Sequence, residues 1–152
     1  MRHLLFICLL FLCVACEENE SVDPTIMPEA TTVEANTFGC LIDGWVYAGG
    51  RWGLPAAEYT LMEDSASITV SAQVGFDSYL RFSIANPQPG ETLPYTNVSF
   101  DNQNIGEGKV HITRMSDGVF SGTFEGGRIT KGRFDLKIRS EGVNPDSGLQ
   151  LF

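Results

Sequence analysis

The sequence predicts an all-β domain, built as an antiparallel β-sandwich or a flattened β-barrel of about 7–9 short strands. Three observations lead to this prediction. Apolar and polar residues alternate with period 2 over several segments, Asp-Gly pairs stand between such segments, and glycine is abundant, with 16 in 152 residues. The alternation leaves one face of each strand polar, which is typical of antiparallel sheets rather than of buried parallel ones.

The alternation also places the strands along the chain. We expect them at 38–42, 45–48, 66–74, 79–84, 109–116, 119–125 and 133–138. Asp43-Gly44 and Asp117-Gly118 favour type I′ hairpins, because both central residues of that turn need a positive φ. Gly126-Gly127 joins the last pair of strands, and the Asn-Pro-Gln-Pro-Gly stretch at 86–90 is a loop. Residues 55–64 fit either a strand or a short helix, and we expect a strand.

The N-terminus has the features of a secretory signal peptide over residues 1–15. Arg2 and His3 precede an apolar run that extends from Leu4 to Ala15. As a helix this run would rise only ~18 Å, whereas the hydrocarbon core of a bilayer is ~30 Å thick. The run is therefore too short to span a membrane.

The end of this run, Leu12-Cys13-Val14-Ala15-Cys16, resembles a bacterial lipobox, although Leu is usual where Cys13 stands. The resemblance implies that Cys16 becomes the N-terminus and carries a diacylglycerol thioether and an N-acyl chain. Three chains would make attachment to the outer membrane effectively permanent. Glu17, Glu18 and Glu20 follow and resemble the surface-export signal of Bacteroidetes lipoproteins, with retention on the periplasmic face as the alternative.

Charge separates a tether from a folded domain. The chain has a net charge of −9, but residues 17–35 contain six acidic residues and no basic one. They show no apolar period, so we expect residues 16–35 to be the lipidated cysteine and a disordered tether, and residues 36–152 to be a single β domain. The overall acidity argues against nucleic acid as a partner and against electrostatic docking to anionic lipid.

Cysteine use fits this organisation. Cys8 and Cys13 leave with the signal peptide and Cys16 takes lipid, so Cys40 is the lone thiol of the domain and forms no intramolecular disulfide. Cys40 shares a face with Phe38 and Ile42, which predicts a buried thiol.

Three stretches of the domain are distinctive. They are residues 36–44 (N-T-F-G-C-L-I-D-G), 121–125 (S-G-T-F-E) and 130–137 (T-K-G-R-F-D-L-K). Together with the lipobox they look like a family of small Bacteroidetes lipoproteins of unknown function. The resemblance implies a location at the cell envelope and brings no catalytic residues. Members of the family often end soon after the G-R-F-D strand, whereas this chain continues through residues 140–152.

No catalytic constellation is found. His111 is the one histidine of the mature chain and stands on the polar face of a strand, so we expect neither a Ser-His-Asp device nor a zinc site, and no enzyme activity. We expect no cofactor, with one calcium candidate among the oxygen ligands of Asp101, Asn102, Asn104 and Glu107. Turn formation by Asx residues explains this stretch equally well.

Aromatic residues give the better lead to a binding site. Trp52 lies between Arg51 and Gly53 in a predicted loop, and Tyr95 follows Pro94, so these two are the candidate ligand-binding residues. Trp45 and Tyr47 share one face of their strand, and we expect both to be packed or both to be exposed.

The charge of the C-terminal half allows two interpretations. Residues 105–140 hold seven basic and four acidic residues, which form either a solvated face or a docking patch for an acidic partner. We therefore expect a lipid-anchored envelope domain that binds a glycan or a protein without catalysis. A structural subunit of a surface complex is the alternative, and a small carboxylate-dependent hydrolase is the third candidate. An unpaired apolar edge strand would favour the second, and two close carboxylates in a cleft would favour the third.

Overall fold

The computed structural model describes residues 26–140, with side chains described through residue 139, and these residues contain nine strands and no helix. No helix among them is long and apolar enough to cross a membrane. The all-β prediction is confirmed. The strands are β1 (Thr37–Ile42), β2 (Trp45–Ala48), β3 (Ala56–Leu61), β4 (Ala66–Gln73), β5 (Tyr79–Ala85), β6 (Thr92–Phe100), β7 (Gly108–Ser116), β8 (Val119–Gly126) and β9 (Ile129–Ser140).

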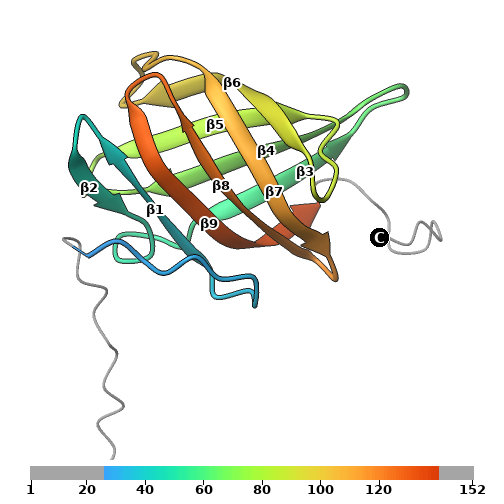
Figure 1. Cartoon of the computed structure of the whole chain (residues 1–152), viewed down its shortest axis with the longest axis horizontal. Coiled ribbons are helices and arrows are strands. Elements are labelled where there is room, and N and C mark those ends of the chain that lie inside the picture. Colours follow the sequence, from blue (N-terminus) through green and yellow to red (C-terminus); the bar gives the residue numbers. More distant parts are fainter. Residues whose placement is uncertain (1–25, 141–152) are drawn as a thin grey trace, which may run out of the picture.

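Seven of these strands close into a flattened barrel (Figure 1). Each strand from β3 to β8 pairs antiparallel with the next strand along the chain. A short parallel pairing between β3 and the end of β9 closes the barrel. The first half of β9 pairs with β1 instead, and β2 follows at the edge of the sheet. Of the two predicted architectures, the barrel is therefore the one observed.

The two Asp-Gly pairs form the predicted hairpins. Asp43 and Gly44 have φ values of 51° and 84°, and Asp117 and Gly118 have values of 53° and 76°. Positive φ at both central residues is the condition for a type I′ turn, whose twist matches that of the flanking strands. Arg128 pairs with Asp43 across the first of these turns and links it to the β8–β9 connection.

Aromatic rings fill the barrel interior. Phe124 stands at their centre, with its ring 5.4 Å from that of Phe38, 4.9 Å from Phe82 and 6.0 Å from Phe134, measured between centroids. All four side chains are at most 2% exposed. Cys40 is fully buried in the same core, as predicted.

The prediction for residues 55–64 is also confirmed, because Ala56–Leu61 form β3. β6 was not predicted. Pro94 lies within this strand, and Asn97 has a φ of 52° where the β5–β6 register shifts, so the period-2 pattern is interrupted.

The expectation for Trp45 and Tyr47 was wrong. Trp45 is 74% exposed at the start of β2, whereas Tyr47 packs edge-on against Phe100.

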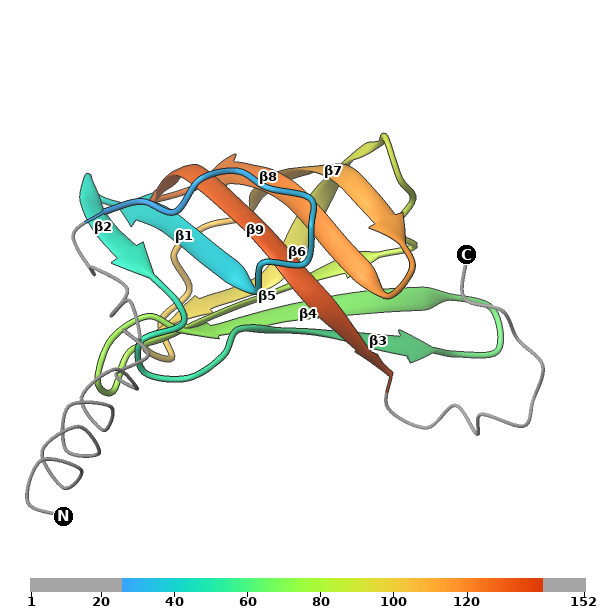
Figure 2. The same cartoon turned by 90° about the horizontal axis from the view of Figure 1, so that it is seen from below.

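The predicted boundary of the tether at residue 35 was wrong as well. Residues 27–36, here called the strap, run along the outside of the barrel across β9 and β8 (Figure 2). At the start of the strap, Pro28 packs so close to Gly39 that a Cβ added to Gly39 would lie 2.5 Å from the Cδ of Pro28. The folded unit thus includes about ten residues that the composition assigned to a disordered segment.

Asp135 of β9 holds the strap. One of its carboxylate oxygens accepts hydrogen bonds from Thr31 Oγ1 (2.5 Å), Val33 N (2.9 Å) and Ala35 N (3.0 Å). The other accepts from Glu34 N (3.1 Å) and from Ser121 Oγ on β8 (2.7 Å). Asp135 is fully buried although it lies on the outer face of the barrel, because the strap covers it.

Burial of the Asp135 carboxylate acts to raise its pKa, but the hydrogen bonds from the strap and from Ser121 outweigh burial and hold the pKa below its ordinary value. This cluster also joins the three distinctive stretches of the sequence. Asn36 Oδ1 accepts a hydrogen bond from Lys137 N, and Ser121 lies opposite Asp135 in the β8–β9 register. The three distinctive stretches therefore meet at the attachment of the strap.

Candidate functional site

Trp52 lies where the sequence predicted it, in the loop between β2 and β3. Its side chain is 40% exposed, and its ring meets that of Phe76, in the β4–β5 loop, edge-on at 5.8 Å between centroids. The guanidinium carbon of Arg51 lies 5.1 Å from the Trp52 ring centroid, at cation–π distance. Phe76 is 73% exposed, so this end of the barrel presents two adjacent aromatic rings to solvent.

Asp77, which follows Phe76 in the chain, lines a polar hollow of about 420 Å³ over strands β4, β5 and β6. Tyr79, at the start of β5, is 56% exposed at its edge. Hydroxyl, amide, guanidinium and carboxylate groups line the hollow, so it can both donate and accept hydrogen bonds. The lining residues are Ser71, Asp77, Tyr79, Leu80, Arg81, Ser99, Asp101 and Asn102.

Gln73 connects the aromatic rings to the polar hollow. Its Nε2 donates to the carbonyl of Phe76 at 2.7 Å, and its Oε1 lies 3.1 Å from where a Cβ on Gly53 would stand. Gln73 also pairs with Tyr79 in the β4–β5 register, so the two side chains share a face of the sheet. We call Trp52, Phe76 and the polar hollow together the binding face.

Asp101 shapes the rim of the polar hollow. Its carboxylate accepts hydrogen bonds from Tyr79 N (3.0 Å) and Ser78 Oγ (3.1 Å), one on each oxygen. Asp101 and Asn102 have φ values of 50° and 63°, as Asx residues in tight turns often do. A carboxylate offers about four lone-pair positions, so Asp101 still has acceptor capacity toward the hollow.

The calcium prediction falls partly on this turn. Asn104 Oδ1 accepts a hydrogen bond from Gly106 N at 2.8 Å, which is again a turn contact. Among the described residues, no group of three or more His, Cys, Asp or Glu side chains is arranged to hold a metal ion. Calcium at Asp101, Asn102, Asn104 and Glu107 stays a prediction, and a thermal melt at millimolar calcium tests it.

Tyr95 is not where a ligand-binding residue would stand. It is fully buried in the core beside Phe82, and its hydroxyl donates to the carbonyl of Gly126 at 3.1 Å. Tyr95 lies in β6, a strand that the sequence did not predict, at a position where the side chain faces the barrel interior. Tyr79, which the alternation placed on a polar strand face, is the exposed tyrosine of the binding face.

Cys40 and His111 lie apart from the binding face. Burial raises the pKa of the Cys40 thiol to about 12, so the thiol stays protonated and is a poor nucleophile. His111 is on the outer face of β7, and its Nδ1 lies 3.1 Å from Thr92 Oγ1. The two residues occupy opposite faces of the barrel wall, as the alternation predicted.

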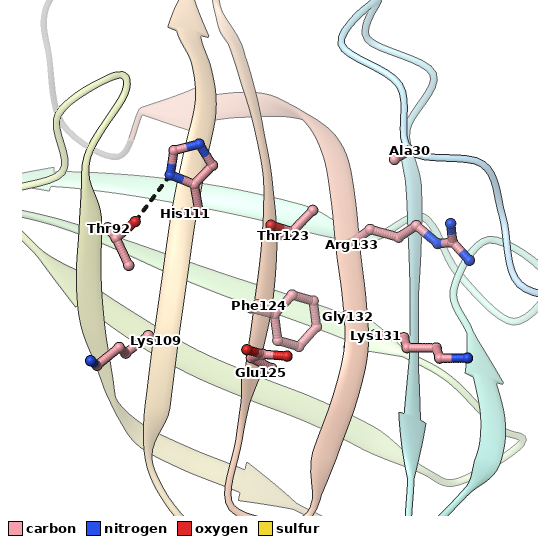
Figure 3. Close-up of a pocket in the computed structure, with 10 residues that line it drawn as sticks. All are labelled: Ala30, Thr92, Lys109, His111, Thr123, Phe124, Glu125, Lys131, Gly132 and Arg133. Atoms are coloured by element: carbon pink, nitrogen blue, oxygen red, sulfur yellow. Dashed lines mark hydrogen bonds between the residues drawn. The ribbon is translucent and has the colours of Figure 1, made fainter.

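His111 contributes to a second hollow, of about 380 Å³, on the outer face of β7, β8 and β9 (Figure 3). We call it the basic hollow, because Lys109, Lys131 and Arg133 line it together with one acid, Glu125. Ala30 of the strap forms its border. The remaining lining residues are Thr92, Thr123, Phe124 and Gly132.

A third hollow, of about 410 Å³, opens at the other end of the barrel and is mainly apolar. It lies between the β5–β6 loop, the β7–β8 turn and the end of β9, so it is a mouth of the barrel. Its lining residues are Tyr59, Pro87, Gln88, Pro89, Met115, Gly118 and Ile138. Residues 141–152, which follow β9 in the sequence, lie outside the described residues.

The lipidation and export predictions, for Cys16, Glu17, Glu18 and Glu20, also fall outside the described residues. Comparison with known proteins matched no family model, no curated protein and no solved structure.

Proposed function

We propose that this chain is a lipid-anchored β domain of the cell envelope that binds a glycan, without catalysis, through the binding face. The observation that carries the proposal is the exposed Trp52–Phe76 pair together with a polar hollow edged by Tyr79. Large aromatic side chains in contact with one another at the surface are costly to leave in water and mark interaction sites.

The chemistry of this face matches a carbohydrate. A pyranose ring has a face of C–H groups that packs on aromatic rings, and hydroxyls that both donate and accept hydrogen bonds. Trp52, Phe76 and Tyr79 offer the rings, and Arg81, Asp101 and the other polar groups of the hollow offer partners for hydroxyls. The hollow volume of about 420 Å³ lies within the range of ~300–1,000 Å³ that is usual for ligand sites.

The test of this proposal is glycan binding by the mature chain and its aromatic variants. A glycan array identifies the best glycan, and calorimetry then compares the wild type with Trp52→Ala and Tyr79→Ala. We expect each variant to bind about tenfold or more weakly, because aromatic residues dominate such contacts. Trp45→Ala is the matched control, since Trp45 is exposed at the β1–β2 turn outside the binding face. Equal losses in all three variants, or no glycan bound by the wild type, would contradict the proposal.

The proposed location rests on the lipobox resemblance of residues 12–16 and on the acidic residues that follow. We expect Cys16→Ser to release the protein from the membrane fraction, because the acyl chains would be lost. Replacing Glu17, Glu18 and Glu20 with Ala should make the lipidated protein resistant to protease added to intact cells. Fractionation and protease digestion measure these effects. A membrane-bound Cys16→Ser protein would argue against lipid anchoring.

A specific observation keeps hydrolysis as a second candidate, because Asp77 and Asp101 line the same polar hollow. Two carboxylates that flank a glycosidic bond are the usual device of glycoside hydrolysis. Incubating the bound glycan with the wild type and with Asp77→Asn, followed by product analysis, distinguishes the two. Cleavage by the wild type alone would replace the binding proposal with a hydrolase. The assembly alternative has less support, since the edge strand β2 has only four residues.

A further inference from the structure

The floor of the basic hollow is one row of side chains that crosses four strands. In the strand registers Thr92 pairs with His111, His111 with Thr123, and Thr123 with Arg133. Residues paired in this way share a face of the sheet. The row therefore places two hydroxyls, an imidazole and a guanidinium side by side on the outside of the barrel.

Lys131 is a second cation of β9 on this face, and it lies in a β-bulge. Gly39 pairs with Arg133 and Leu41 pairs with Thr130, so Cys40 lies opposite two residues of β9 instead of one. Lys131 and Arg133 are two residues apart, so both lie on the outer face, and the extra residue lets Ile129 still point into the core. In Figure 3 these two side chains extend from β9 to the same side of the hollow, whereas Lys109 points the other way.

Lys131 occupies the bulge at a conformational cost. Its φ is 52°, in the left-handed region, where lysine is uncommon and where glycine or asparagine would be relaxed. Among the other described non-glycine residues with positive φ, all but Glu34 are Asn or Asp. Backbone strain of this kind is found at functional sites more often than elsewhere, because a strained residue there can serve ligand binding or catalysis.

Arg133 has an unmet hydrogen bond. Its Nε is buried and has no hydrogen-bond partner among the described residues. A buried N–H of a charged group without an acceptor is unfavourable, so an acceptor that enters the hollow beside Arg133 would be stabilised by it. Glu125 lies opposite Lys109 in the β7–β8 register and offsets its charge, which leaves Lys131 and Arg133 in excess.

We infer that the basic hollow binds an oxyanion, a sulfate or phosphate ester carried on a sugar. Lys131 and Arg133 bind the oxyanion, and the row of Thr92, His111 and Thr123 meets the hydroxyls of the sugar. The volume of about 380 Å³ exceeds what a bare oxyanion fills, which favours an ester on a larger molecule. This site is separate from the binding face and does not depend on the function proposed for it.

Calorimetry on the mature chain carrying Cys16→Ser tests this inference with glucose 6-sulfate, glucose 6-phosphate and uncharged glucose. We expect one or both esters to bind, more weakly as salt is added, and glucose to bind at least tenfold more weakly. The two esters distinguish a sulfated from a phosphorylated source. Failure of both esters to bind, or equal binding of glucose, would overturn the inference.

Three variants locate the site. Arg133→Gln should weaken ester binding about tenfold, because it removes a charge-assisted hydrogen bond. Lys131→Gly should weaken it similarly while leaving the melting temperature unchanged or raised, since glycine relieves the positive φ. Glu125→Gln should strengthen it by roughly threefold, because a repulsive charge is lost.

Arg139→Gln is the matched control, since Arg139 is exposed on the same strand and does not line the hollow. An equal effect of Arg139→Gln and Arg133→Gln would show general charge attraction and not a site. Trp52→Ala should leave ester binding unchanged, so this site and the binding face can fail independently. If Arg133→Gln does not fold, Lys131→Gly and Glu125→Gln still decide the question, and wild-type affinity in both would overturn the inference.

Discussion

Replacing Asp135 with Asn should lower the free energy of unfolding by about 3 kcal/mol and detach the strap. The carboxylate accepts five hydrogen bonds, three of them from backbone N–H groups of residues 33–35. An amide offers one acceptor oxygen in place of two, and its NH₂ group would face donors at the other position. The buried Ser121 hydroxyl would then lose its acceptor as well.

Urea denaturation of the mature chain measures this loss, and limited proteolysis within residues 27–36 reports release of the strap. Asp117→Asn is the matched control, because Asp117 is exposed and pairs only with its neighbours Arg114 and Ser116 among the described residues. We expect the control to change stability by less than about 0.5 kcal/mol. A strap that remains protected in Asp135→Asn would contradict the role assigned to the carboxylate.

The same carboxylate sets a dependence on pH. The pKa of Asp135 is lowered in the folded state, so its stabilising effect is fully present above the unfolded-state value of about 3.9. That effect is lost as the pH falls through the lower folded-state pKa. Wild-type stability should therefore decrease below about pH 4 more steeply than that of Asp135→Asn, which urea titrations between pH 3 and 7 would show.

Replacing Phe124 with Ala should cost about 3–5 kcal/mol, the usual range for a large aromatic residue in a core. Its ring is within 6.2 Å, between centroids, of the rings of Phe38, Phe82, Tyr95 and Phe134, so the cavity would open at the centre of the barrel. Rings from several strands surround that point, and the barrel cannot collapse to fill it without shifting them. A domain with ordinary stability of ~5–15 kcal/mol would become marginal.

Phe76→Ala provides the control for this prediction, because it removes the same side chain at a position that is 73% exposed. We expect it to change stability by less than about 0.5 kcal/mol while weakening glycan binding at the binding face. Thermal unfolding followed by circular dichroism compares the two variants. Equal destabilisation by both would show that the aromatic cluster is not the centre of the core.

The distinctive stretches of the sequence have a structural explanation in this fold. Phe38, Phe124 and Phe134 supply rings of the core, and Ser121 and Asp135 hold the strap. Gly39 leaves room for Pro28. These residues account for a stable attachment of the N-terminal segment to the barrel, and the binding face uses none of them.

The sequence by itself determined the all-β class, most of the strands, both Asp-Gly hairpins and the burial of Cys40. These features depend on period-2 alternation and on turn residues, which are local. It also determined that Trp52 lies in an exposed loop, because Gly53 and Arg51 flank it. The other strands were found from their local alternation, whereas β6 was missed because Pro94 and the bulge at Asn97 interrupt that alternation.

Only the tertiary structure decided the closure of the barrel, the attachment of the strap and the composition of the polar hollow and the basic hollow. Closure depends on pairing between β3 and β9, which are far apart in sequence, and no local pattern encodes it. The strap is held by Asp135, which is about a hundred residues away in the sequence. An acidic segment without an apolar period is therefore held in place by a residue outside that segment. The binding face likewise joins loops and strands from residues 52 to 102, and its chemistry exists only once the chain has folded.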